Sequence, residues 1–287
     1  MAVLVTGGAG FIGSHMVAEL MENGMEPIVL DNLSTGNRKA VMCDRLYIGD
    51  IRNPGDLDKV FSENDIESVV HFAAASIVPE SMADPAKYYD NNINGTLGLL
   101  KAMERHKVSR LVFSSTAAVY GEAEQIPINE ACPTNPKSPY GETKLAMERM
   151  IEWFSRAGLL KYVSLRYFNA CGAHPSGKIG EWRPAETHLI PIILQYLLGM
   201  RESFYVYGTD YETHDGTCVR DYIHISDLVR AHTAALGYLE NKNKSEIFNL
   251  GMGRGFSVLE IIKAAEEATG MPVRFETAER RQGDPAV

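Results

Sequence analysis

The fold of this chain is decided by Thr6-Gly7-Gly8-Ala9-Gly10-Phe11-Ile12-Gly13, a glycine-rich stretch near the N-terminus. It follows an apolar run over residues 2–6 that predicts a strand, and it leads into a helix-period stretch over residues 12–22. The glycines satisfy G-x-G-x-x-G from Gly8 and G-x-x-G-x-x-G from Gly7, in the required strand–turn–helix context. Without a Cβ, the backbone can touch a pyrophosphate whose charge is stabilised at the helix N-terminus. The stretch therefore predicts a dinucleotide-binding unit.

An acidic residue after the second predicted strand indicates which dinucleotide is bound. That strand covers residues 27–30 and is followed directly by Asp31. A carboxylate at this point can accept hydrogen bonds from an adenosine ribose and would repel a 2′-phosphate. We therefore expect NAD rather than NADP.

Short apolar runs continue to alternate with helix-period stretches through the first half of the chain. Further buried strands are predicted over residues 45–48, 68–72, 111–115 and 163–166. Further helices are predicted over residues 56–63, 85–104 and 140–154. This alternation predicts an α/β fold, a Rossmann-type doubly wound parallel sheet covered on both faces.

The alternation breaks after Arg166. Residues 172–186 hold several glycines and prolines and indicate an irregular excursion, followed by a helix over 189–198 and a strand over 204–207. Later elements are expected as helices over 225–239 and 258–268 and a strand over 247–250. We expect an NAD-binding domain over residues 1–170 and a smaller C-terminal substrate domain over 171–287, with segments near 218–250 returning to the first domain.

The residues for proton transfer come from Tyr140-Gly141-Glu142-Thr143-Lys144. At i and i+4 on a helix, Tyr140 and Lys144 share a face, and an ammonium beside a phenol favours the phenolate that can act as a base. The spacing alone also fits an exposed helical pair. Thr116 follows the strand predicted over residues 111–115, at the carboxyl edge of the sheet where sites of α/β proteins form. Together the three residues predict a catalytic set.

The bulk composition excludes several classes of protein. The chain has 287 residues, 45% of them hydrophobic, and a net charge of −9, which argues against non-specific binding to nucleic acid or anionic membranes. Its four cysteines are far apart, which favours reduced thiols in the cytoplasm and no metal site. No apolar run approaches the roughly eighteen residues of a membrane span, and we expect no targeting segment before the first strand.

Several longer stretches then give the sequence a family resemblance. It resembles the extended short-chain dehydrogenase/reductases and, among them, the UDP-galactose 4-epimerases. The glycine stretch is common to many extended members, whereas Asp31-Asn32-Leu33-Ser34, His71-Phe72-Ala73-Ala74, Tyr88-Tyr89-Asp90-Asn91-Asn92 and Asn94-Gly95-Thr96 are more specific. The most specific stretches are Arg166-Tyr167-Phe168-Asn169, Gly172-Ala173-His174-Pro175-Ser176-Gly177, Asp215-Gly216-Thr217 and Val219-Arg220-Asp221-Tyr222-Ile223-His224.

The resemblance implies a cofactor site and a substrate site. NAD would meet Gly7, Gly10, Phe11, Ile12, Gly13, Asp31, Asn32, Asp50, Ile51, Phe72, Ala73, Ala74, Asn91, Ser114, Tyr140, Lys144 and Tyr167. A UDP-hexose would meet Thr116, Tyr140, Phe168, Asn169, His188, Leu189, Tyr207, Arg220, Arg281 and Asp284. An arginine fork suits a diphosphate, and a tyrosine ring can lie against a uracil.

The sequence departs from the family pattern in three places. Ala75-Ser76-Ile77 stands where some epimerases carry a lysine, and His188 stands where some carry an asparagine. Family members also usually continue for tens of residues beyond Val287. The acceptance of N-acetylated UDP-sugars stays open, because the resemblance places the residue that controls it in that continuation.

The implied reaction is the interconversion of UDP-glucose and UDP-galactose. Tyr140 would remove the O4 proton with Thr116 in the relay, the C4 hydride would pass to NAD, and a 4-keto sugar would turn over before taking the hydride back. The resemblance also implies a homodimer, formed through the helices expected over 85–104 and 140–154.

Three alternatives carry different predictions. A nucleotide-sugar 4,6-dehydratase needs an acid and a base after the strand-end threonine, whereas Thr116 is followed by Ala117-Ala118. A UDP-glucuronate decarboxylase or epimerase is disfavoured by the stretches over 172–177 and 215–224. A non-catalytic NAD-binding regulator would retain NAD without turning over a UDP-sugar.

Overall fold

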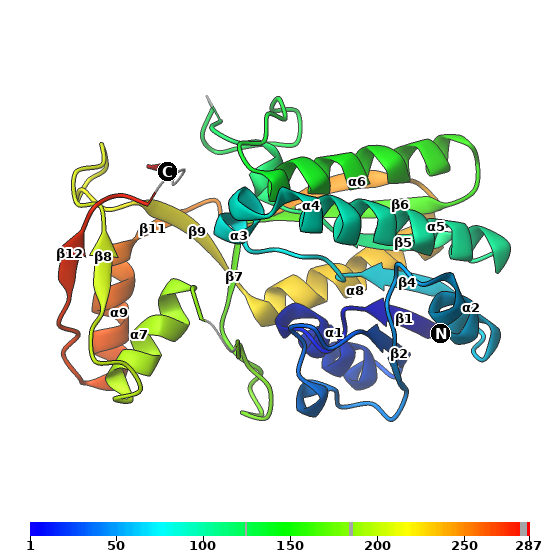
Figure 1. The fold of residues 1–287 in the computed structure, drawn as a ribbon, viewed down its shortest axis with the longest axis horizontal. Coiled ribbons are helices and arrows are strands. Elements are labelled where there is room, and N and C mark those ends of the chain that lie inside the picture. The colour runs from blue at the N-terminus through cyan, green and yellow to red at the C-terminus, as the bar shows by residue number, and fades with distance from the viewer. Residues whose placement is uncertain (124, 184–185, 282–285) are drawn as a thin grey trace. The chain divides into compact units, whose positions relative to one another are not determined.

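Two compact units make up the computed structural model, which describes residues 1–123, 125–183, 186–281 and 286–287. Unit 1 comprises Met1–Gly180 and His224–Leu250, and unit 2 comprises Glu181–Ile223 and Gly251–Val287. The ribbon is drawn in Figure 1. Among the described residues, no helix is both long and apolar enough to cross a membrane.

A parallel sheet forms the centre of unit 1. Within the described part of the chain it has seven strands in the order β10-β6-β5-β4-β1-β2-β3, which confirms the predicted Rossmann-type sheet. The strands of unit 1 are β1 Ala2–Thr6, β2 Glu26–Asp31, β3 Leu46–Ile48, β4 Ser68–His71, β5 Arg110–Ser114, β6 Lys161–Tyr167, β10 Glu246–Leu250 and the separate short strand β7 Asn169–Cys171.

Helices cover both faces of this sheet (Figure 1). The helical elements of unit 1 are α1 Phe11–Glu22, η1 Arg38–Ala40, α2 Pro54–Ser62, α3 Val78–Ala83, α4 Pro85–Tyr88, η2 Tyr89–Asn94, α5 Gly95–Arg105, η3 Ala117–Val119, α6 Pro139–Arg156 and α8 Ile225–Lys242. α1 packs against α8 on one face. α2, α5 and α6 lie on the other face, where Leu57, Leu99, Met147 and Ile151 join the strand residues in the main hydrophobic core. Burial of these apolar side chains is the main force that holds the layers together.

The helix predicted over 85–104 differs from the structure. It is divided into α4, the π-helical η2 and α5. Tyr88, Asn92 and Thr96 are all fully buried at a spacing of four residues, which is longer than one α-helical turn. A π turn is wider than an α turn, so it keeps these three side chains on one face. The sequence pattern could not separate the two kinds of turn.

Unit 2 has small sheets and a helix pair. Its elements are α7 Leu189–Leu197, β8 Tyr205–Tyr207, β9 Val219–His224, β11 Gly255–Ser257, α9 Val258–Thr269 and β12 Glu276–Ala278, with β9 ending at the boundary with unit 1. β8 pairs with β12 in parallel, and β9 pairs with β11 antiparallel. α7 packs against α9 around a core that contains Ile193, Phe204 and Ile262. This core includes Val206 and so holds β8 in place.

Candidate active site

The glycine stretch forms a tight turn between β1 and α1. Gly7 has φ +73°, and a Cβ on it would lie 2.7 Å from the backbone nitrogen of Ala73. A Cβ on Gly13 would overlap the carbonyl oxygen of Gly7. Gly10 is the N-cap of α1 and provides no side-chain cap, so the first amide groups of the helix receive no side-chain acceptor from it. Unsatisfied amides at a helix N-terminus form a binding site for an anion.

Asp31 lies beside this turn, at the end of β2. It is 8% exposed, and its carboxylate accepts hydrogen bonds from the amides of Ala9, at 2.9 Å, and Leu33, at 2.8 Å. Burial raises the pKa of Asp31, against the effect of these amides. The carboxylate therefore connects the glycine turn to the loop after β2, and each of its oxygens keeps further lone pairs for a ribose hydroxyl.

Asp50 and Asn32 form a second polar group near the same edge. The side-chain amide of Asn32 donates to Asp50 at 3.0 Å, and Arg52 forms an ion pair with Asp50 at 2.8 Å. Hydrogen bonding from Arg52 holds the pKa of Asp50 well below its usual range. Asp50 is therefore an anion throughout the physiological pH range.

The segment after β4 is held by Asn92, which the sequence analysis did not select. Asn92 is fully buried, and its Oδ1 accepts from the amide of Ala75 at 2.8 Å. Its Nδ2 donates to the carbonyl of Ala75 and to Oγ1 of Thr143, the latter at 3.0 Å. Asn92 therefore joins the segment that follows Phe72, Ala73 and Ala74 to the helix that carries Tyr140. The neighbouring Asn91, which the sequence predicts as a cofactor ligand, donates to Oδ1 of Asn92.

The predicted catalytic residues gather where β5 ends and α6 begins. Thr116 is the N-cap of η3, and its hydroxyl accepts from the amide of Ala118 at 3.1 Å. α6 packs against η3 so closely that a Cβ on Gly141 would lie 2.7 Å from the carbonyl oxygen of Ala118. Ser138 caps α6, so Tyr140 lies in the first turn of the helix and Lys144 one turn later.

Lys144 is fully enclosed at this point. Its Nζ donates to the carbonyl oxygen of Ser114 at 2.7 Å and lies 5.0 Å from the centre of the Phe113 ring. Burial lowers the pKa of Lys144 to about 7, and the charge of Glu148 acts in the opposite direction. Ser114 also bonds through its hydroxyl to Tyr167, whose pKa is raised by burial. Lys144 and Tyr167 are therefore both tied to Ser114 at the end of β5.

His188, in unit 2, is positioned by two carboxylates. It is the N-cap of α7, and its Nδ1 lies 2.9 Å from Oε1 of Glu186 and 3.2 Å from Oε1 of Glu181. Burial raises the pKa of Glu181, whereas for Glu186 the hydrogen bonds from His188 outweigh burial and the pKa is lowered. Nδ1 therefore carries a proton toward the carboxylates, and this fixes the orientation of the ring.

Tyr207 and Arg281 lie together on the surface of unit 2. Tyr207 ends β8, and the guanidinium of Arg281 lies 4.2 Å from the centre of its ring. Arg220, on β9, donates from Nη1 to the carbonyl of Val219 at 2.7 Å. Leu189 is the first residue of α7, directly after His188. Asp284, the last predicted substrate ligand, falls outside the described residues.

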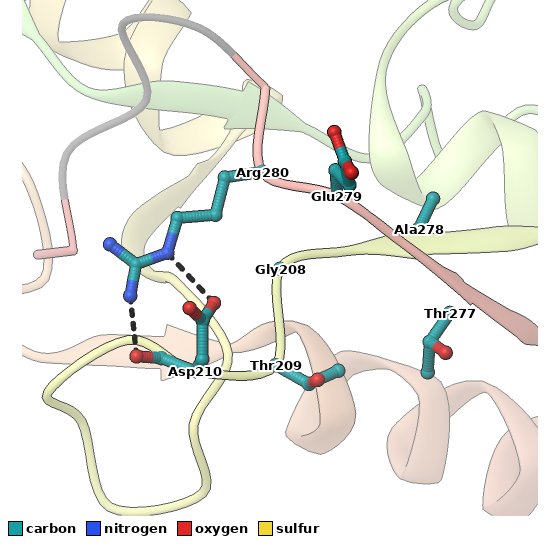
Figure 2. Close-up of a pocket in the computed structure, with 7 residues that line it drawn as sticks. All are labelled: Gly208, Thr209, Asp210, Thr277, Ala278, Glu279 and Arg280. Carbon is teal, nitrogen blue, oxygen red and sulfur yellow. Dashed lines mark hydrogen bonds and ion pairs between the residues drawn. The ribbon is translucent and has the colours of Figure 1, made fainter.

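A surface pocket adjoins these residues along the chain, and the sequence did not predict it. It is lined by Gly208, Thr209, Asp210, Thr277, Ala278, Glu279 and Arg280. Figure 2 shows Arg280 reaching Asp210 across the pocket, where its Nε donates to the carboxylate at 2.8 Å. The lining of the pocket includes none of the predicted catalytic residues. It does include the sequence neighbours of two predicted substrate ligands, since Gly208 directly follows Tyr207 and Arg280 directly precedes Arg281.

Comparisons with known proteins identify the family. The family model described as "NAD dependent epimerase/dehydratase family" matches residues 3–251. The chain belongs to this family. It is similar to a UDP-glucose 4-epimerase of Halalkalibacterium halodurans, 54% identical over 100% of this chain and 86% of the relative. A solved UDP-glucose 4-epimerase of Brucella ovis in complex with NAD is 46% identical, with a TM-score of 0.96 over 99% of this chain and 88% of that one. A third, from Bifidobacterium longum in complex with NAD⁺ and UDP, is 41% identical, with a TM-score of 0.93 over 100% of this chain and 88% of that one.

The first unit of this epimerase/dehydratase family member fits NAD. Close packing at Gly7 and Gly13 leaves no room for side chains, and the first turn of α1 has no side-chain cap to compete with an anion. Asp31 lies next to the turn with oxygens suited to a ribose. Unit 1 also contains Phe168, which follows β6, and Asn169, which begins β7.

Proposed function

We propose that this family member is a UDP-glucose 4-epimerase, which uses NAD to invert C4 of a UDP-hexose. One observation carries the proposal: Lys144 is buried one helical turn after Tyr140 and donates to the carbonyl oxygen of Ser114 at the end of β5. The named relatives support the same reaction, because they are UDP-glucose 4-epimerases and match this chain over nearly its whole length.

Tyr140 is the proposed base. Its phenol would take the O4 proton of the hexose, because the adjacent Lys144 ammonium stabilises the phenolate. Thr116 would relay this proton by hydrogen bonding, and Phe168 and Asn169 would complete the hexose contacts. Bound NAD would accept the C4 hydride and return it to the opposite face of the 4-keto sugar. Net redox change is zero, so cofactor that escaped in the reduced state would end the cycle.

NAD contacts are assigned to unit 1 and UDP contacts to unit 2. Gly7, Gly10, Phe11, Ile12 and Gly13 would hold the pyrophosphate through backbone amides, with Asp31 on the ribose. The other proposed NAD contacts are Asn32, Asp50, Ile51, Phe72, Ala73, Ala74, Asn91, Ser114, Tyr140, Lys144 and Tyr167. For UDP we propose His188, Leu189, Tyr207, Arg220 and Arg281.

The experiment is a direct search for the epimer. The purified chain is incubated with UDP-galactose, and separately with UDP-N-acetylgalactosamine, without added NAD. We expect UDP-glucose from the first substrate and a transient absorbance of reduced nicotinamide in a single turnover. Retained NAD without any turnover of UDP-galactose would identify a cofactor-binding protein of another function. The second substrate reports whether the enzyme accepts N-acetylated sugars.

We also propose that the enzyme is a homodimer in the cytoplasm. Large apolar side chains are exposed on α3, η2 and α6, namely Met82 at 58%, Tyr89 at 46% and Trp153 at 66%, and a helical bundle with a second copy would cover them. Cys43 and Cys132 are unbridged thiols, as expected in a reducing compartment. Light scattering on the purified protein tests the dimer, with a monomer mass as the contrary result.

A further inference from the structure

Two residues of α6 hold two consecutive residues of the chain that leads to Thr116. Lys144 donates to the carbonyl oxygen of Ser114, at 2.7 Å. Glu148, one turn further along the same helix, accepts a short hydrogen bond from the hydroxyl of Ser115. Because Ser114 and Ser115 directly precede Thr116, the two contacts fix the end of β5 against the helix that carries Tyr140.

Glu148 is itself held by a buried ion pair. Its side chain is 4% exposed, and that of its partner Arg166, on β6, is 6% exposed. Arg166 donates to the carboxylate from Nη2 at 2.6 Å and from Nε at 2.9 Å. Ser164 adds a hydroxyl at 3.2 Å, and Nη1 of Arg166 donates to the hydroxyl of Tyr120 at 2.9 Å. The carboxylate is therefore enclosed, and both of its oxygens accept hydrogen bonds.

Replacing a buried ion pair by well-packed apolar side chains of similar size is often neutral for stability, so stability alone does not account for this pair. Its position suggests another role. We propose that Glu148 is a positioning residue of the epimerase, which holds Ser115 so that Thr116 faces Tyr140 and supplies the negative charge that keeps Lys144 an ammonium. The proposal rests on the function proposed above for Tyr140, Lys144 and Thr116.

The charge effect has a defined sign. Burial lowers the pKa of Lys144 and the charge of Glu148 raises it, so removing that charge releases the lysine proton at lower pH. Other titratable groups around the Tyr140–Lys144 pair stay in place in such a variant: His71 of β4, Arg166 and Tyr167 of β6, Glu80 of α3 and Tyr88 of α4. The charged groups Asp90 of η2 and Arg105 of α5 are exposed and paired elsewhere, with Arg52 and Asp58.

The test uses two substitutions of Glu148 and one of its contact Ser115, and compares them with a control substitution on the same helix. Glu148→Gln keeps the shape and removes the charge, and we expect the alkaline limb of its pH–activity profile, where Lys144 loses its proton, to move to lower pH by about one unit. Glu148→Asp keeps the charge and shortens the reach, and we expect about tenfold lower kcat with an unmoved profile. Ser115→Ala removes only the hydroxyl that Glu148 holds, and we expect a similar loss of kcat with KM unchanged. The control is Glu152→Gln, since Glu152 lies one turn further on, exposed and paired with Arg156 on the surface.

Turnover is not the only measurement. Titration of the phenolate absorbance, with Tyr140→Phe protein subtracted, follows the charge of the pair without substrate. The Glu148→Gln protein is expected to form its phenolate at higher pH than the parent, because its Lys144 loses the stabilising ammonium charge at lower pH. If the parent itself fails to turn over UDP-galactose, the proposed function fails, and this titration still tests Glu148 alone.

The contrary outcomes are specific. An unmoved profile and an unmoved phenolate titration in folded Glu148→Gln protein would overturn the charge role. Parental kcat in Ser115→Ala would overturn the positioning role, and this variant changes no charge, so it decides that point even if Glu148→Gln does not fold.

Discussion

The guanidinium carbon of Arg281 lies 4.2 Å from the centre of the Tyr207 ring, at the end of β8. A cation over an aromatic face is held in a defined direction. We predict that Arg281→Met raises the KM for UDP-galactose about tenfold or more and weakens inhibition by UDP equally, while kcat changes little. The neighbouring Arg280→Met is the control, because Arg280 is occupied by Asp210 and Tyr211. Equal KM values for the two variants would count against a diphosphate role for Arg281.

Removal of one oxygen tests the base. Tyr140→Phe is expected to lower kcat by about 10²–10⁴-fold, because the proton of O4 then has no phenolate to accept it. NAD content, measured after denaturation of the purified protein, should stay near the parental value. Tyr47→Phe, on β3, is the matched control, since its hydroxyl donates to Glu63 and accepts from Asn64, away from the predicted catalytic residues. A Tyr140→Phe protein as fast as the parent would remove Tyr140 from the mechanism.

Two glycine substitutions should change stability in opposite directions. Gly13→Ala would bring a methyl group into the carbonyl of Gly7, so we expect it to lower the free energy of unfolding by about 1–3 kcal/mol and to reduce NAD content. Gly237→Ala, within α8, meets nothing within 4 Å and should raise that free energy by about 0.5–1 kcal/mol. Denaturant unfolding measures both. The same sign for both variants would contradict the close packing of the glycine turn.

The stability of the protein should fall in acid because of a buried histidine. His232 is fully buried, and burial lowers its pKa from 6.5 to about 4. As the pH falls from 6.5 toward 4, this histidine is protonated in the unfolded chain but stays neutral in the folded chain. The stability that is present above pH 6.5 is therefore lost over that range. His232→Gln should reduce this loss by about 3 kcal/mol, measured by denaturant unfolding across pH. The exposed His214→Gln should leave the pH dependence unchanged, and a parental slope in His232→Gln would refute the argument.

Cofactor choice should depend on Asp31. In Asp31→Asn one oxygen remains to accept an amide, but the charge that repels a 2′-phosphate is gone. We expect the preference for NAD over NADP to fall about tenfold to a hundredfold in binding titrations. Asp44→Asn, exposed after η1, is the control for net charge. An unchanged preference would mean that Asp31 holds the loop after β2 but does not select the cofactor.

Much of unit 1 could be predicted because its signals are local. Strand β1 was predicted with its exact limits, and the glycine stretch identified the turn that follows it. α6 extends the predicted 140–154 to Pro139–Arg156, because Ser138 and Pro139 begin the helix earlier than the apolar pattern does. Apolar spacing marks the buried face of an element but not its caps.

The remaining elements depend on contacts that are distant in sequence. β11 and β12 have three residues each, too few to show a period, and they are defined by pairing with β9 and β8. Glu148 carried a visible signal, a carboxylate four residues after Lys144 on the same helix face. Its partner Arg166 could not be assigned from spacing, since only the sheet brings β6 beside α6.

The tight fit of Gly13 on Gly7 has a consequence for how long a dinucleotide stays bound. A turn whose backbone is already fixed by its own packing gives up little conformational freedom when a ligand arrives, so more of the contact energy appears as affinity. Slow dissociation of the cofactor follows from such preorganisation. An enzyme that must recover its own hydride at every cycle benefits from a tightly bound cofactor more than from an exchangeable one.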